Sequence, residues 1–346
     1  MHPDHSSGRI EMDMLTVHSA QVDYPAPHRR ALPLRVGTRG SPLALTQTKA
    51  FIRDLQKTCP ALEGENTSLD IIRTTGDATQ ASGCRLADIG GKGLFSKEID
   101  EAMLAGRIDI AVHSLKDLET TMRPGILLGC ILPREHASDV LVLGPDCAIP
   151  DPWEPWACLP DGAAVGTASV RRQAQLLHAR PDLKVGLIRG NVQTRLDKVA
   201  SGATQATLLA YAGLRRLGLA ERASLIIHPE LMVPAAGQGI VGITVRENDE
   251  QMREMLLAIE DAHARACATA ERALLARLDG SCSTPIGAHA RICASGDLHL
   301  TGLVASVDGV FLLKRKLSGP LSDAARIGDE LGQSLKTDSP AWIFAP

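Results

Sequence analysis

From Leu32 onward the chain alternates short apolar runs of strand length with longer amphipathic runs of helix length. In the first hundred residues after that point, strands are expected over residues 34–38, 69–75 and 108–112. The helices between them have their own start signals, since Ser41 and Ser96 stand at N-cap positions ahead of the first amphipathic turn. Strand–helix–strand order of this kind predicts a parallel sheet with helices on its faces.

A second α/β block follows the proline-rich stretch 150–160, which has the composition of a loop. Its strands are expected over residues 163–166, 183–188 and 206–210, and its helices from Ser169 to 177, over 191–200 and up to Arg216. Residues 233–239 then return the chain to the first block, where 240–245 is again strand-like. The first two lobes are therefore expected to be linked by crossing segments.

The last ninety residues or so change character, since an alanine-rich helix over 261–278 precedes two alternating runs joined through Asp308-Gly309. Such a pair of runs, 298–305 and 310–317, predicts a hairpin, and a final amphipathic helix follows over 321–335. The fold class is thus α/β, with two doubly wound lobes and a small α+β C-terminal domain. The expected domains are 31–135 with 236–257, 138–233, and 260–346, after an N-terminal extension 1–30.

Composition excludes several classes of protein. Lysine and arginine total 37 against 40 acidic residues, and aromatic residues are 3%, which argues against nucleic-acid binding. No apolar run reaches the ~20 residues of a membrane span. The eight cysteines form no C-x-x-C pair, as expected for free thiols and no metal site. Residues 1–30 are polar, lack the apolar core of a secretory signal and are expected to be a disordered tail.

Six arginines fall at or just beyond the carboxyl ends of the expected strands, where open α/β sheets bind ligands. They are Arg39, Arg171, Arg172, Arg189, Arg195 and Arg216. Any one of them is compatible with a solvated helix face. Together they favour a pocket for a ligand that carries several carboxylates or phosphates, because guanidinium groups bind such anions in a bidentate way.

Asp117 and Lys116 follow the third strand and are candidates for the chemistry of this edge. A carboxylate among cations stabilises a developing positive charge or transfers protons, although a loop aspartate has the same position. His113, just before them, is equally compatible with simple packing. The run 90–93 lacks the spacing of a nucleotide-binding loop and favours a glycine hinge that carries Lys92 and Phe95.

Cys282 lies in a Gly/Ser/Pro-rich loop after the helix 261–278 ends. Such a loop exposes the thiol, which indicates either a modified cysteine or an unreactive surface one.

Seven strings in register resemble the hydroxymethylbilane synthase family, also called the porphobilinogen deaminase family, over about residues 33–320. The strings are 35–45, 90–95, 111–117, 165–173, 187–196, 234–239 and the Cys282 loop. Asp88, Ala168, Thr244 and Ser281 depart from the pattern, as does Leu118-Glu119, where a proline is usual after the aspartate.

The resemblance implies an enzyme that condenses four porphobilinogen molecules head to tail, with loss of ammonia. It implies a dipyrromethane cofactor joined to Cys282 by a thioether, and Asp117 as the catalytic acid and base. The implied binding residues for cofactor and substrate are Arg39, Ser41, Lys92, Phe95, Lys116, Thr167, Ser169, Arg171, Arg172, Arg189, Arg195 and Arg216. The protein is also expected to be a monomer in the cytoplasm and to pass its product to uroporphyrinogen-III synthase.

Two alternatives come from other classes of protein. Two α/β lobes with crossing segments also describe periplasmic-type binding proteins, which would close on an anionic solute without catalysis. A scaffold protein that has lost its activity is the other alternative. The binding protein would require neither Cys282 nor a third domain, and an activity assay separates all three hypotheses.

Overall fold

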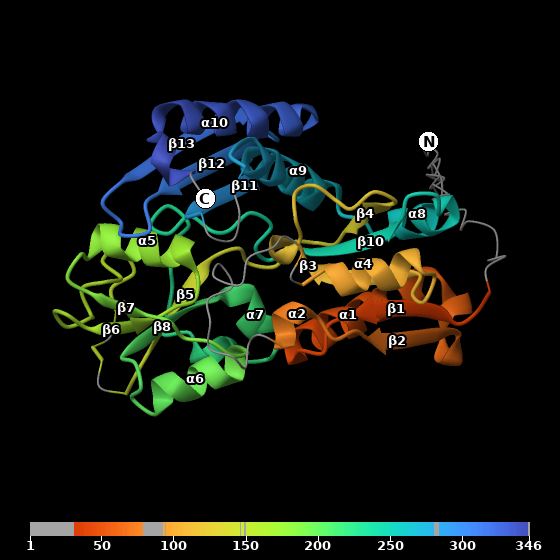
Figure 1. The fold of residues 1–346 in the computed structure, drawn as a ribbon, viewed down its shortest axis with the longest axis horizontal. Helices are drawn as coiled ribbons and strands as arrows, with labels where there is room; N and C mark the ends of the chain where they lie inside the picture. Colours follow the sequence, from red (N-terminus) through yellow and green to blue (C-terminus); the bar gives the residue numbers. More distant parts are fainter. Residues whose placement is uncertain are drawn as a thin grey trace, which may run out of the picture.

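The computed structural model describes residues 31–78, 93, 95–145, 147–148, 150–279 and 284–344. Within these ranges the chain forms three β-sheets. Figure 1 shows two α/β lobes side by side, with the third sheet and its two long helices lying across both of them.

The first lobe has a five-stranded sheet in the order β2-β1-β3-β10-β4. Its strands are β1 (Leu34–Thr38), β2 (Thr67–Ile71), β3 (Ile110–Ser114), β4 (Ile126–Ile131) and β10 (Val241–Arg246). Its helices are α1 (Pro42–Thr58), α2 (Thr75–Ala78), α4 (Lys97–Leu104) and α8 (Glu250–Leu257). The predicted parallel pairing of β1, β2 and β3 is confirmed. Strand β10 enters between β3 and β4 and runs antiparallel to both, so the complete sheet is mixed.

The second lobe repeats this plan with the order β7-β6-β8-β5-β9. Its strands are β5 (Asp139–Leu143), β6 (Ala164–Gly166), β7 (Lys184–Gly186), β8 (Ala206–Ala210) and β9 (Leu225–Ile226). Its helices are α5 (Val170–Ala179), α6 (Val192–Ala200) and α7 (Tyr211–Arg216). Here β5, which arrives from the first lobe, runs antiparallel to β8, so this sheet is mixed as well.

Two segments cross between the lobes, as expected. Residues 132–138 lead from β4 to β5, and residues 227–240 lead back from β9 to β10. Strand β10 pairs with β3 of the first lobe, which confirms the predicted return of the chain.

The C-terminal part consists of a three-stranded antiparallel sheet and two helices. These are β11 (Ile286–Ile292), β12 (Leu298–Ala305), β13 (Leu312–Gly319), α9 (Ala262–Arg277) and α10 (Ala324–Asp338). The predicted β12–β13 hairpin is confirmed. Strand β13 begins later than expected because the turn extends to Phe311. The Asp308 carboxylate accepts a hydrogen bond from Val310 N, and Ser306 Oγ accepts one from Phe311 N.

Local hydrogen bonds explain the helix starts and the shifted strand ends. Ser41 and Ser169 cap their helices with side-chain bonds. Ser96 does not, because the chain is already in a helical turn there, with Ser96 N bonded to Gly93 O. Strand β2 ends at Ile71 because Thr74 Oγ1 accepts from Asp77 N and starts a turn.

Strand β3 also starts later than the apolar pattern predicts. Ile108 N bonds Ala102 O at the end of α4, and the Asp109 carboxylate accepts from both the main chain and the guanidinium of Arg35. Each sheet covers its own buried apolar cluster. The domain boundaries given above stay a prediction, since sheet connectivity does not measure which segments fold independently.

Candidate functional site

Asp117 lies in a single 3₁₀ turn, Leu115–Asp117, directly after β3. Arg39, which follows the neighbouring parallel strand β1, places Nη1 3.6 Å from Asp117 Oδ2. The same guanidinium donates to Asp77, with Nη2 2.5 Å from Oδ1, and its Cζ lies 4.0 Å from the centre of the Phe95 ring. The first lobe therefore brings together Asp117, Arg39 and Phe95, as the sequence predicts.

His113, near the end of the same strand, is buried and shares a 3.0 Å hydrogen bond between Nε2 and Thr244 Oγ1. Burial, and after it the charge of Arg39, lowers the pKa of His113 to about 4. The ring is therefore neutral at physiological pH, and its contacts fit the packing interpretation.

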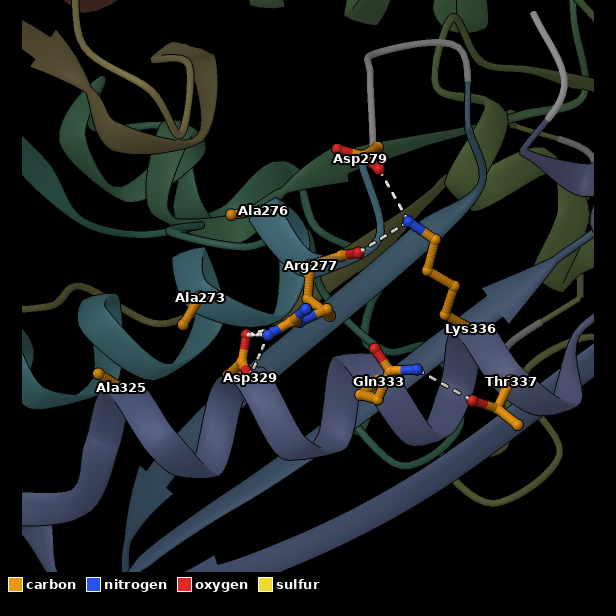
Figure 2. Close-up of a pocket in the computed structure, with 9 residues that line it drawn as sticks. All are labelled: Ala273, Ala276, Arg277, Asp279, Ala325, Asp329, Gln333, Lys336 and Thr337. Atoms are coloured by element: carbon orange, nitrogen blue, oxygen red, sulfur yellow. Dashed lines mark hydrogen bonds and ion pairs between the residues drawn. The ribbon is translucent and has the colours of Figure 1, made fainter.

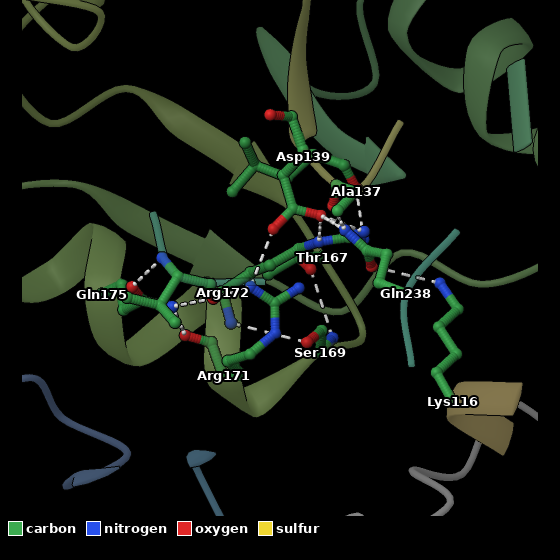
Figure 3. A network of polar contacts seen from close by, with 12 residues as sticks. Lys116, Ala137, Asp139, Thr167, Ser169, Arg171, Arg172, Gln175 and Gln238 are labelled. Atoms are coloured by element: carbon green, nitrogen blue, oxygen red, sulfur yellow. Dashed lines mark hydrogen bonds and ion pairs between the residues drawn. The ribbon is translucent and has the colours of Figure 1, made fainter. Parts of the chain in front are cut away.

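The second lobe contributes a buried ionic network around Asp139, which Figure 3 shows. Arg171 Nη1 lies 2.7 Å from Asp139 Oδ2, and Arg172 donates to Asp139 Oδ1 through Nε and Nη2. All three side chains are at most 6% exposed. Burial alone would raise the pKa of Asp139, but the two guanidinium groups outweigh it and hold that pKa far below its usual range.

Asp139 thus resolves a conflict in the sequence. Two cations in the first turn of α5 oppose the helix dipole unless an anion is present. The protein supplies that anion from the start of β5. Arg171 and Arg172 are consequently held by an internal carboxylate, and Arg171 Nε has no hydrogen-bond partner in the described part of the chain.

Lys116 connects this network to the first lobe. Its Nζ lies 3.3 Å from Gln238 Oε1, while Gln238 Nε2 donates to Asp139 Oδ1 and Ala137 O (Figure 3). Lys116 is exposed to solvent as a residue, although many protein atoms surround its ammonium group. Burial and the nearby Arg172 lower the pKa of Lys116 to about 8.

Arg195 lies within electrostatic reach of Arg172 and Asp117, and Arg189 lies within reach of Arg195. Burial, and after it the charges of Arg172 and Arg189, lowers the pKa of Arg195 to about 10, while Asp117 acts in the opposite direction. Arg195 Nε donates to Gly190 O, which fixes its stem beside the start of α6. Cations from the second lobe therefore face the carboxylate of the first.

The predicted hydroxyl groups serve the local backbone. Ser41 Oγ accepts from Ala44 N, Ser169 Oγ accepts from Arg172 N, and Thr167 Oγ1 accepts from Ser169 N. Their role toward a ligand stays a prediction.

Arg216 differs from the other arginines. It donates to Gly239 O at 2.7 Å, so it ties α7 to the second crossing segment, with Glu135 as the charge that acts on it. Lys92 and Cys282 lie outside the described residues.

Sequence reasoning missed Asp77, Asp139 and Gln238. The signal for Asp139 was present, since a charged residue directly precedes the apolar run Val140–Leu143 at the head of a strand. Such a charge is buried only when it is paired. No comparable signal marked Gln238, because its partners are distant in sequence.

Two cavities lie away from these charges. Figure 2 shows a groove of about 770 Å³ between α9 and α10, in which Arg277 pairs with Asp329 and Lys336 with Asp279. A second cavity of about 400 Å³ lies where residues 134–138 meet α9 and β11. The paired charges of the groove leave it poorly suited to a ligand with many negative charges.

Over the same described ranges, no group of three or more His, Cys, Asp or Glu side chains is placed to hold a metal ion. Nor is any helix there long and apolar enough to cross a membrane.

Comparison with known proteins gives family matches over nearly all of the folded chain. A family model described as porphobilinogen deaminase, dipyromethane cofactor binding domain, matches residues 34–254. A second, described as porphobilinogen deaminase, C-terminal domain, matches residues 265–337.

Curated relatives agree with these matches. Porphobilinogen deaminase of Nitrobacter hamburgensis is 45% identical over 310 residues, covering 89% of this chain and 94% of its own. The enzyme of Paracoccus denitrificans is 44% identical and covers 90% and 96%. The chloroplastic enzyme of Oryza sativa is 42% identical and covers 90% and 85%.

Similar solved structures include two periplasmic binding proteins. A putative sulfonate-binding protein of Methylobacillus flagellatus is 15% identical, with a TM-score of 0.34 and coverage of 68% and 67%. A solute-binding protein of Desulfovibrio salexigens is 10% identical, with a TM-score of 0.36 and coverage of 70% and 81%. Similarity this low carries no argument about function.

Proposed function

The chain belongs to the porphobilinogen deaminase family, and from this premise we propose which of its residues bind and which react. Porphobilinogen deaminase, or hydroxymethylbilane synthase (EC 2.5.1.61), joins four porphobilinogen molecules head to tail with loss of ammonia. Water then releases the linear hydroxymethylbilane. Each porphobilinogen carries an acetate and a propionate, so the growing chain gains about two negative charges at every step.

The charges between the lobes fit a dipyrromethane cofactor, which is itself built from two such units. Six cations gather here, namely Arg39, Lys116, Arg171, Arg172, Arg189 and Arg195. With Arg189 left out of the balance, the other five cations are acted on by three carboxylates of the described chain, namely Asp77, Asp117 and Asp139. This excess of positive charge suits a ligand with several carboxylates.

When bound, the dipyrromethane supplies the free pyrrole carbon to which the first porphobilinogen is joined. We assign its attachment to Cys282, in the loop that follows α9. A covalent attachment removes the entropy cost of binding the growing chain anew at each step.

The binding residues come from both lobes in this proposal. Arg39 and Lys116 act from the first lobe, while Arg189 and Arg195 act from the second. Arg171 and Arg172 contribute as a pair that Asp139 has partly neutralised. Thr167, Ser169 and Ser41 direct hydroxyl groups to the ligand, Phe95 acts from beside Arg39, and Arg216 acts from α7. Lys92, which lies outside the described residues, is assigned to the same binding set.

Asp117 is assigned the chemistry. As the acid it gives a proton to the amino group, which leaves as ammonia when the carbon–nitrogen bond of porphobilinogen breaks. As the carboxylate it stabilises the positive charge left on the substrate ring and then takes the proton displaced by the new carbon–carbon bond. The contact between Asp117 and Arg39 supports this assignment, because the contact places the carboxylate among the anion-binding cations.

Replacing Asp117 by Asn tests the assignment. The amide has the same shape but neither charge nor a transferable proton, so we expect kcat to fall by about 10²–10⁴-fold. Asp54→Asn, on the exposed side of α1 where Asp54 pairs with Lys57, is the matched control. An Asp117→Asn enzyme that forms hydroxymethylbilane at the wild-type rate would remove Asp117 from the mechanism.

The remaining parts of the proposal concern the molecule in its cell. We infer a monomer in the cytoplasm that passes its product to uroporphyrinogen-III synthase.

A further inference from the structure

Helix α9 carries two adjacent side chains, Glu271 and Arg272, that reach out of the C-terminal domain in different directions. Glu271 is fully buried. Its carboxylate accepts from Arg134 Nη1 at 2.5 Å, from Gly237 N at 2.6 Å and from Ala290 N at 2.6 Å. One side chain therefore joins α9 to both crossing segments and to β11, which fixes the helix at the junction of all three sheets.

Arg272 reaches instead to the segment that follows Asp117. Its Nη2 donates to Glu119 O at 2.6 Å and to Thr120 O at 3.1 Å, and its Nη1 to Leu118 O at 3.5 Å. Burial, and after it the charge of Arg265, lowers the pKa of Arg272 to about 10. Every hydrogen-bond acceptor that the described chain offers this guanidinium is a main-chain carbonyl or the sulfur of Met122.

The segment that Arg272 contacts has little regular secondary structure. Residues 118–123 form neither helix nor strand, and the first proline after Asp117 is Pro124. Carbonyl groups in an irregular segment need donors from elsewhere. A guanidinium has five N–H groups in a rigid plane and can hold successive carbonyls, which an ammonium group does less well.

The position of Arg272 joins two parts of the site. Leu118 is the residue after Asp117, and α9 ends at Arg277, five residues before Cys282. We propose that Arg272 is a positioning residue, which holds the backbone of Leu118–Thr120, and with it Asp117, in place relative to the end of α9 that leads to Cys282. This inference rests on the proposed function, since it gives those two residues their roles.

The test uses the full-length, cofactor-loaded enzyme and three variants. Arg272→Met keeps an unbranched stem but removes the donors, and Arg272→Lys keeps the charge with a poorer geometry. Arg277→Met is the matched control, since Arg277 lies on the same helix and pairs with Asp329 at the surface. The readouts are cofactor loading by intact mass, kcat and KM, the unfolding midpoint, and amide hydrogen exchange over residues 118–122.

For Arg272→Met we expect exchange in that segment to rise by about 10-fold or more. We expect kcat per loaded molecule to fall by roughly 10–100-fold, because small misplacements of a reacting group have effects of this size. KM and the unfolding midpoint should stay close to those of Arg277→Met, and Arg272→Lys should lie between.

Unchanged exchange with unchanged kcat would overturn the proposal, as would an equal loss in Arg277→Met. A loss of kcat that only follows a lower unfolding midpoint would show a general structural role and would overturn it too. If the wild type itself forms no hydroxymethylbilane, the proposed function fails, and the exchange data still decide whether Arg272 restrains the segment.

Discussion

At the residue scale, Lys116 has a charge that changes near the working pH of the site. Its pKa is lowered to about 8, first by burial and then by Arg172. In the proposed function, the ammonium attracts a substrate carboxylate below that pH, and the attraction is lost above it. We therefore expect kcat/KM, which reports the free enzyme, to fall as the pH rises through about 8.

Lys116→Arg separates this titration from others in the reaction. A guanidinium stays protonated through the same range, so the fall in kcat/KM on the alkaline side should move upward by about one pH unit or more. Profiles of kcat/KM against pH for both enzymes provide the measurement. If the two profiles coincide on the alkaline side, Lys116 does not bind the substrate as a cation.

Asp100, on α4, gives a second pH-dependent prediction. Its side chain is 6% exposed, Oδ1 has no hydrogen-bond partner in the described part of the chain, and burial raises its pKa to about 6. The pKa of Asp100 in the unfolded chain is about 4. Ionisation of Asp100 therefore does not lower the stability of the folded protein below pH 4, and the protein loses stability as the pH rises through 6.

Asp100→Asn removes the charge that burial disfavours. We expect the free energy of unfolding to increase by roughly 1–3 kcal/mol above pH 6, with no gain near pH 4. Denaturant unfolding at the two pH values measures both numbers. An equal gain at both would mean that ionisation of Asp100 is not the cause.

The site could be predicted from sequence only in part at this scale. The resemblance and the strand ends pointed to Asp117, Arg39 and Arg195, and the structure brings them together. The sequence indicates that Asp139 is paired but not with which residues, because Arg171 and Arg172 lie more than thirty residues away and meet it only in the fold.

At the scale of elements, the packing of α10 on α9 depends on Gly328. A Cβ atom at this position would lie 2.2 Å from Ala270 O and 2.7 Å from Ala273 Cβ, in the middle of α9. Both neighbours belong to a helix that Glu271 holds in place, so the contact has little room to relax.

Gly328→Ala should therefore destabilise the C-terminal domain by about 1–3 kcal/mol or more. Gly186→Ala, in β7, is the control, since a Cβ there meets nothing within 4 Å. Thermal unfolding of the two variants compares the effects. A midpoint for Gly328→Ala that matches the control would mean that the two helices separate at no cost.

Elements were predicted well where local chemistry decides them. Residues 34–38 and 206–210 match β1 and β8, because both are short apolar runs between turn signals. Strand β5 was not predicted, and no direction was predicted for β10. Each of them enters its sheet from a crossing segment and runs antiparallel to its neighbour. Periodicity records which face is buried but not which way a strand runs.

At the scale of the whole molecule, the crossing segments and α9 hold the parts of the site together. Lys116, Gln238 and Asp139 form a continuous polar path from the first lobe to the second (Figure 3). Glu271 and Arg134 join that junction to the C-terminal domain. We therefore propose that this scaffold presents a cofactor anchored at Cys282 to the cations and to Asp117.

The most direct test is the intact mass of the denatured protein, measured for the wild type and for Cys282→Ser. We predict that the wild type carries an additional mass of two linked pyrrole units and that the variant does not. If the wild type is unmodified, incubation with porphobilinogen should load it. A wild-type protein that gains no mass after that incubation, or a Cys282→Ser variant that still carries the adduct, would contradict the account.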